Sequence, residues 1–202
     1  MAIQARKGDF IQTHTGRAFW PLDPRPEDVC IEDIAHSLAT TARFNGHARE
    51  IYYNAQHALI VSQIAEGMAT GSNRAYAAFI GLHHDDHEAY LFDAPSPLKR
   101  QGIIVGGESL KTVEHSIDWA IFGAFGILDF PAELYHIVHK ADLIALATEK
   151  RDVMAPTQLK WAPLPEPWQY TIVPTDNWRG LKAEFIHRHN TLLRILQDTK
   201  CP

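Results

Sequence analysis

Apolar residues recur three or four positions apart over much of the chain, which is the spacing typical of amphipathic helices. The first such stretch begins at Ile31, ends at about Arg43 and is followed by the helix stop signal Asn45-Gly46. The same spacing predicts helices over 55–68, from Asn73 to about Tyr90, and over 108–123, 131–153 and 179–198. Asn54 is placed to cap the helix over 55–68, and Pro131 is placed in the first turn of the helix over 131–153.

Three segments lack this periodicity. Glycines and a proline-rich run make residues 1–30 an irregular arm, with a short strand expected over 9–13. Two prolines make 93–97 a loop, and 155–178, with five prolines and three tryptophans, is expected to wrap around the helices. The fold class is therefore expected to be all-α. We expect a helical bundle in one domain over 1–202, with its core at about 30–153 and a C-terminal segment and helix over 155–202.

The composition excludes several classes of protein. Of 202 residues, 46% are hydrophobic and 21% charged, as in ordinary globular proteins, and a net charge of −5 gives no basic surface for a nucleic acid polymer. No stretch reaches the roughly 18 uninterrupted apolar residues of a membrane span, and the first residues lack a secretory signal, so a cytoplasmic protein is expected. Cys30 and Cys201 fit no metal-binding spacing and are expected to be reduced thiols.

Histidines and carboxylates carry the candidate chemistry. The chain has twelve histidines, and the run 83–88 places several titratable groups at the end of an expected helix, as a metal site or a solvated face would. His57 has apolar neighbours on the preceding helix and is expected to point inward. Asp142 lies in an apolar helical stretch, where a buried carboxylate needs a partner such as a cation. With His84 and Asp85 these residues would form a mixed site for Mn, Co, Fe, Ni, Zn or Mg.

The order of these residues resembles a known family. His57, the doublet His84-Asp85 and the distant Asp142 are similar to the H…HD…D signature of the HD-domain phosphohydrolases. Further matches occur in the order and spacing of the 5′-deoxynucleotidase-like branch, over about 30–153. They are Arg43-Phe44, Ala55-Gln-His57-Ala58, Leu82-His-His-Asp85-Asp-His-Glu88-Ala-Tyr90, Asp93-Ala-Pro-Ser-Pro97-Leu-Lys99 and Lys140-Ala-Asp142. The chain departs from the branch at Phe44, where the best-known nucleotidases have tryptophan.

This resemblance implies one divalent metal ion held by His57, His84, Asp85 and Asp142, with Asp85 also counted as catalytic. A bound metal lowers the pKa of water and polarises a phosphoryl oxygen. Glu88 is expected to orient the attacking water or accept its proton, because four residues after His84 it would share the same helix face.

The remaining candidate residues would bind the substrate. Arg43 and Lys99 would meet the phosphate, and Asp93 resembles the position that meets the sugar hydroxyl, although it would equally cap a turn. Phe44 and Trp20 could flank a base, with a core role favoured for Trp20, and His47 could touch the phosphate or a leaving oxygen.

The function expected from the resemblance is release of phosphate from nucleotides, by a 5′-nucleotidase acting on deoxynucleoside monophosphates. The main alternative is a triphosphohydrolase acting on a dNTP such as dATP at the same site. The few cations nearby in sequence favour the monophosphate. Less favoured are a non-catalytic nucleotide sensor and a di-iron oxygenase that would recruit His83, Asp86 or His87. These three residues could support a second metal, but solvated roles or roles that support the first site are favoured for them. A homo-oligomer formed through helices outside the site is also expected.

Overall fold

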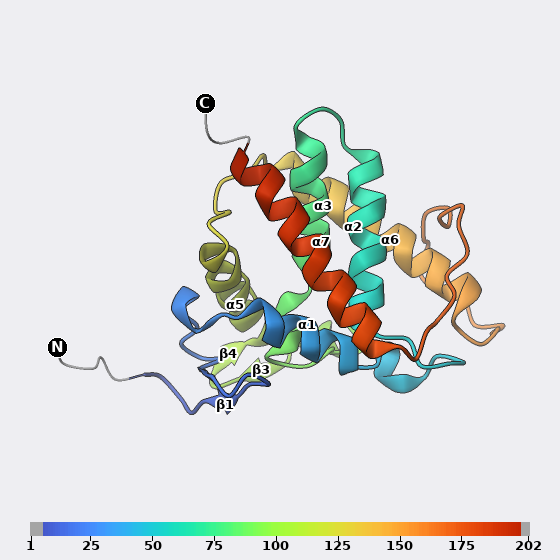
Figure 1. Cartoon of the computed structure of the whole chain (residues 1–202). Coiled ribbons are helices and arrows are strands. Elements are labelled where there is room, and N and C mark those ends of the chain that lie inside the picture. The colour runs from blue at the N-terminus through green and yellow to red at the C-terminus, as the bar shows by residue number, and fades with distance from the viewer. Residues whose placement is uncertain (1–5, 199–202) are drawn as a thin grey trace. The chain divides into compact units, whose positions relative to one another are not determined.

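The computed structural model describes residues 6–198, so Cys201 lies outside the described residues. The chain is mostly helical, with seven α-helices and two small antiparallel sheets of two strands each in the described part, and the expected all-α class is confirmed (Figure 1). Two compact units are present, one formed by residues 6–37 and 86–129 and the other by 38–85 and 130–198. Within 6–198, no helix is both long enough and apolar enough to cross a membrane.

The first unit contains the N-terminal arm and the middle of the chain. Its elements are β1 (Ile11–Gln12), β2 (Ala18–Phe19), η1 (Pro26–Asp28), most of α1 (Ile31–Thr40), η3 (Asp86–Ala89), α4 (Ser96–Lys99), β3 (Ile104–Val105), β4 (Glu108–Ser109) and α5 (Leu110–Ala124). Helix α5 packs against η1 and η3. The buried rings of Phe19 and Tyr90 stack with their centroids 3.6 Å apart, which ties the arm to the segment after η3.

The second unit is a bundle of four helices that carries the candidate site. These helices are α2 (Asn54–Met68), α3 (Asn73–His83), α6 (Glu133–Asp152) and α7 (Trp178–Asp198). Helix α2 contacts the other three (Figure 1). At Gly81 on α3, an added Cβ would lie 3.1 Å from the carbonyl oxygen of Val61 on α2. The absence of a side chain there therefore lets the two helices that carry the histidines approach closely.

The segment after α6 packs back onto that helix. The backbone N–H of Trp168 donates to the hydroxyl of Thr148 at 2.8 Å, and the N–H of Ile172 donates to the carboxylate of Asp152 at 2.9 Å. The expected wrapping segment is therefore held to α6 by polar side chains of that helix.

Several expected element boundaries are wrong. Helix α1 ends at Thr40, and Arg43 begins the separate 3₁₀ turn η2 (Arg43–Gly46). Asn54 is the first residue of α2 and does not cap it; the cap position is the extended Tyr53, and the side chain of Asn54 is buried. Asn54 uses its backbone N–H to bind the carbonyl of Thr41, so the chain before α2 is anchored to the end of α1.

The correction with the largest effect on the site concerns α3. This helix ends at His83, because the chain turns at His84 and Asp85 and restarts as the short 3₁₀ helix η3. It therefore does not run to Tyr90 as predicted.

Smaller differences lie at prolines and strands. Pro131 precedes α6 and its carbonyl accepts from Leu134, while Pro97, expected in a loop, lies in the first turn of α4, where its missing N–H needs no partner. The expected strand over 9–13 is reduced to β1. The helix expected from 108 begins at Leu110, with the hydroxyl of Ser109 accepting from the N–H of Thr112 as an N-cap.

Candidate metal centre

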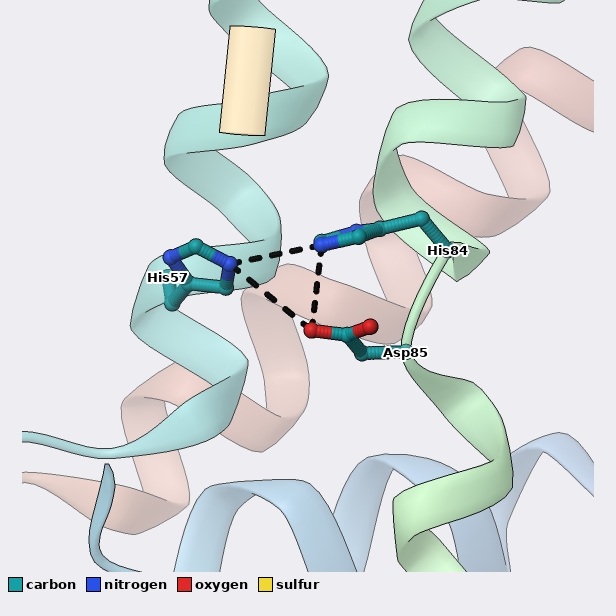
Figure 2. Close-up of side chains that lie close together, drawn as sticks. All are labelled: His57, His84 and Asp85. Atoms are coloured by element: carbon teal, nitrogen blue, oxygen red, sulfur yellow. Dashed lines mark hydrogen bonds and ion pairs between the residues drawn. The ribbon is translucent and has the colours of Figure 1, made fainter. Parts of the chain in front are cut away.

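Three elements of the second unit bring two histidines and two aspartates together. His57 lies in the first turn of α2, His84 and Asp85 follow the end of α3, and Asp142 lies in the middle of α6. The ligand atoms of His57, His84 and Asp85 all lie within 4.8 Å of one another (Figure 2), which confirms that residues able to hold a metal ion come together. The Oδ1 atom of Asp142 lies 3.3 Å from the Nε2 atom of His57 and 3.9 Å from that of His84.

The hydrogen bonds at Nδ1 of the two imidazoles decide what their Nε2 atoms, which face the cluster, can bind. The Nδ1 atom of His84 lies 2.9 Å from the carbonyl oxygen of Gly81, and that of His57 lies 2.6 Å from a carboxylate oxygen of Glu149. Both partners are acceptors, so each Nδ1 carries a proton, and in the neutral ring, which is the form that binds a metal, Nε2 has its lone pair free for a ligand bond. These two Nε2 atoms are 3.3 Å apart.

The donor set therefore fits a cation. Two imidazole lone pairs and two carboxylate oxygens face one another, and four acceptors at such distances repel unless a positive charge lies among them. Nitrogen and oxygen ligands in this ratio suit a borderline divalent metal, and four protein ligands leave positions for water or substrate in a five- or six-coordinate ion.

The pKa values of the two histidines also show that the cluster favours a positive charge. Burial lowers the pKa of His84, but the charges of Asp85 and Asp142 and a hydrogen bond to Asp85 outweigh burial and raise the pKa to about 10. Burial and the charge of Arg43 lower the pKa of His57, and Glu149 and Asp142 reverse this to a net increase. The two carboxylates therefore favour positive charge on the histidines, which a metal would supply in place of protons.

The four residues differ in exposure. The side chain of His57 is 1% exposed, as its apolar neighbours predict, whereas Asp85 and Asp142 are 26% and 29% exposed. Asp142 is therefore half-buried and not fully buried as expected, although Ala141 and Ala145 beside it on α6 are buried. Solvent reaches part of both carboxylates, while the imidazole of His57 is enclosed.

A buried network that the sequence did not indicate lies behind His57. Glu149, on α6, is fully buried and accepts from the hydroxyl of Tyr52 at 2.9 Å and from the Nε atom of Arg43 at 3.2 Å, in addition to His57. Burial raises the pKa of Glu149, but the charges of Arg43 and His57 and the hydrogen bonds from His57 and Tyr52 outweigh it and lower the pKa. The only signal in the sequence is that Glu149 follows Asp142 by seven residues, which is two helical turns.

Arg43 is expected to bind phosphate, and the backbone that follows it is unusual. The next two residues, Phe44 and Asn45, have φ angles of +57° and +52°, a left-handed conformation that costs roughly 1–2 kcal/mol for each residue. This turn places the Arg43 guanidinium 5.2 Å from the centroid of the Phe44 ring. His47 ends the turn with an exposed side chain, and its backbone N–H donates to the carbonyl of Phe44.

The other expected site residues belong to the first unit. Glu88 lies in η3 with its side chain 3% exposed. The argument that it shares a continuous helix face with His84 is wrong, because α3 ends at His83, before both residues. The ammonium group of Lys99 lies 3.0 Å from Glu114 and 3.7 Å from Glu88. Asp93 is half-buried in the loop before α4.

The aromatic candidate Trp20 is half-buried within the arm. The guanidinium of Arg6 lies 4.1 Å from the centroid of its ring, and the ring of Phe10 packs beside it at 5.5 Å. These contacts describe packing of Trp20 within the arm. Cys30 is a free thiol that donates to the carboxylate of Glu32.

The additional titratable residues of the run 83–88 have partners within their own units. His83 is fully buried on α3, with its Nε2 atom 3.0 Å from the Nδ1 atom of His189 on α7. His87 bonds through Nδ1 to Asp118 at 2.9 Å, and Asp86 is fully buried.

The fold and the site together define the class of protein: a helical bundle with a candidate metal centre of histidine and aspartate. The chain is 35% identical over 189 residues to the uncharacterized protein YfdR of Escherichia coli K12, covering 92% of this chain and 97% of YfdR, and it belongs to the same family. It is also 28% identical over 190 residues to the uncharacterized protein RCAP_rcc00048 of Rhodobacter capsulatus, covering 90% of this chain and 94% of that protein. No family model matches the chain.

Proposed function

We propose that the protein is a metal-dependent phosphohydrolase of the HD-domain superfamily that releases phosphate from nucleotides, and specifically a 5′-nucleotidase acting on deoxynucleoside monophosphates. One observation carries the proposal. Four acceptor atoms of His57, His84, Asp85 and Asp142 face one another while both imidazole protons are used elsewhere, at Glu149 and at Gly81. The order of these four residues in the sequence is that of the phosphohydrolase signature.

The four side chains would hold one divalent cation, which when bound supplies Lewis acidity toward a phosphoryl oxygen and an acidic water. The partly exposed carboxylates of Asp85 and Asp142 leave a side of the cluster open to a small substrate. His57 and His84 are neutral ligands, and with two aspartates the site would keep no excess negative charge against a phosphate.

Arg43 would bind the phosphate group through its guanidinium, because it is joined through Glu149 to the metal ligand His57. Glu88 would accept the proton of the attacking water. It follows Asp85 by three residues in the chain, and its carboxylate is buried, which favours proton uptake. Lys99 would keep Glu88 and Glu114 in place and contribute positive charge.

The choice of monophosphate rests on the small number of cations in the second unit near the cluster. Arg43 is the cation bonded into the cluster's own network, whereas a triphosphate carries charge that several cations usually meet. A base could stack on Phe44, whose ring is held beside Arg43 by the left-handed turn.

The test is phosphate release by metal-stripped protein to which Mn²⁺, Co²⁺, Ni²⁺, Zn²⁺ or Mg²⁺ is returned, with nucleoside mono- and triphosphates as substrates. We expect metal-dependent orthophosphate from deoxynucleoside monophosphates, lost in Asp85→Ala and retained in Asp176→Ala, which removes an exposed carboxylate. Tripolyphosphate released from a dNTP would replace the nucleotidase with the triphosphohydrolase. A protein that binds metal but releases phosphate from no nucleotide would refute the proposal.

A further inference from the structure

Glu149 is the point where the candidate metal ligand and the candidate phosphate ligand meet. Its carboxylate has no exposed surface, and it accepts hydrogen bonds from three places in the chain: His57 in α2, Tyr52 before α2, and Arg43 in η2. One oxygen, Oε1, accepts from His57 and Tyr52, and the other, Oε2, accepts from Arg43. A buried carboxylate with donors on both oxygens has little freedom to rotate.

The bond to His57 fixes which nitrogen of the imidazole faces the cluster. Figure 2 shows the His57 ring with one nitrogen directed toward His84 and Asp85 and the other directed away from them. The outward nitrogen is the Nδ1 atom that lies 2.6 Å from Glu149. Because the carboxylate holds the proton on Nδ1, Nε2 keeps its lone pair toward the cluster, and the bond also makes that lone pair more basic.

The bond to Arg43 fixes the guanidinium in the same way. Arg43 is 11% exposed, and the Nε–H that it gives to Glu149 orients the planar group about its long axis. The same carboxylate therefore orients an imidazole through one oxygen and a guanidinium through the other.

We propose that Glu149 is a positioning residue that aligns His57 for metal binding and Arg43 for phosphate binding, so that the two affinities depend on one buried carboxylate. The metal part stands on the geometry of the cluster, and the phosphate part rests on the proposed function. Without the Glu149 carboxylate, His57 and Arg43 would keep their places in the fold but lose their fixed orientation.

Glu149→Gln tests both parts, since it keeps the size of the side chain and removes the charge and one acceptor. We expect Co²⁺ to bind the variant about 10- to 100-fold more weakly than the wild type, measured by competition with a chelator. We also expect a changed visible spectrum of bound Co²⁺, which a purely structural role for Glu149 would leave as in the wild type. The matched control is Glu66→Gln. Glu66 lies further along α2 and forms an ion pair with Arg188 on α7, so this variant also loses a carboxylate and its ion pair but should bind Co²⁺ like the wild type.

Titration of inorganic phosphate into Co²⁺-saturated protein tests the second part. We expect weaker phosphate binding by Glu149→Gln, about tenfold, and no change in Glu66→Gln. Wild-type phosphate affinity in Glu149→Gln would overturn the role assigned to Arg43 orientation, and wild-type Co²⁺ affinity with an unchanged spectrum would overturn the role toward His57.

A measurement on the wild type keeps the inference testable if Glu149→Gln fails to fold. In the Zn²⁺-loaded protein, ¹H–¹⁵N correlation spectra of the histidine rings should show the proton of His57 on Nδ1 and the metal on Nε2; the reverse would overturn the inference. None of these measurements uses turnover. A protein that hydrolyses no nucleotide but shows the expected Co²⁺ and Zn²⁺ results would refute the proposed function and leave the metal part of this inference in place.

Discussion

Two pairs of histidines lie in the same helical bundle. The adjacent residues His83 and His84 belong to different pairs. His84 pairs with His57, with 3.3 Å between their Nε2 atoms, and His83 pairs with His189, with 3.0 Å between Nε2 and Nδ1. The first pair is surrounded by the carboxylates of Asp85 and Asp142, whereas the second is packed between the rings of Phe79 and Phe185. The chain at the end of α3 directs His83 and the following His84 to different sides.

The surroundings give the two pairs opposite properties. The carboxylates raise the pKa of His84 to about 10, whereas burial, together with the charge of His83, lowers the pKa of His189 to about 3. In the aromatic pair one neutral ring can donate to the other, so the bond is satisfied without a cation. The comparison teaches that adjacent carboxylates, and not the number of histidines, distinguish a candidate metal site from a packed histidine pair.

The largest expected effect comes from removing a carboxylate from the first pair. Asp142→Asn keeps the size of the side chain but removes the charge 3.3 Å from the Nε2 atom of His57. We expect Co²⁺ or Mn²⁺ affinity to fall by more than about 100-fold, beyond the loss typical of a residue outside the ligand shell. Competition with a chelator measures this, with Asp176→Asn as the control, and metal affinity equal to the wild type would show that Asp142 is not a ligand.

Removing one ring from the aromatic pair should affect folding but not the metal. In His189→Leu the Nε2 atom of His83 loses a partner within the core, which we expect to reduce the free energy of unfolding by about 1–3 kcal/mol. Urea denaturation measures the stability, and chelator competition should give the wild-type Co²⁺ affinity. If metal affinity fell as far as in Asp142→Asn, the two pairs would not be independent.

Helix positions followed from the sequence, but helix ends did not. Apolar periodicity placed the bundle helices correctly, because it reflects burial along one face. The end of α3 depends on contacts that periodicity does not contain: the turn at His84 and Asp85 includes a bond from the His84 ring to the backbone of Gly81. The early end of α1 likewise goes with a hydrogen bond from the backbone N–H of Asn54 to the carbonyl of Thr41, and the spacing of apolar residues does not indicate such a bond.

The candidate metal ligands could be named from the sequence for a similar reason, and their supports could not. His57, His84, Asp85 and Asp142 form a recognisable order along the chain, so the resemblance named them as candidates before any geometry was known. Glu149 contacts His57 across 92 residues of sequence, and His189 contacts His83 across 106 residues. A glutamate or histidine on a helix has no sequence pattern that names such a partner. Long-range polar pairs are decided by how helices pack, which only the structure shows.

The low pKa of His189 sharpens the comparison through pH. Between its ordinary pKa of 6.5 in the unfolded chain and about 3 in the folded protein, the unfolded chain binds a proton that the folded protein excludes. Stability due to this residue therefore falls as pH decreases below 6.5, by about 1 kcal/mol per pH unit. The stability advantage of metal-free wild type over His189→Leu should thus narrow between about pH 7 and pH 5. Urea denaturation in the presence of a chelator measures the difference, and an advantage that stays constant would contradict the buried, neutral state of His189.

The smallest expected effect concerns the hydroxyl of Tyr52, which donates to the same Glu149 oxygen as His57. Tyr52→Phe keeps the buried ring and leaves the bonds of His57 and Arg43 to Glu149 in place, so we expect Co²⁺ affinity to fall only a few-fold and stability by about 1 kcal/mol. Tyr135→Phe, at a 60% exposed tyrosine, is the control and should match the wild type in both measurements. A loss of metal affinity as large as that of Glu149→Gln would mean that Glu149 cannot orient His57 without the hydroxyl. In that case the buried support of the carboxylate-rich pair would extend to Tyr52.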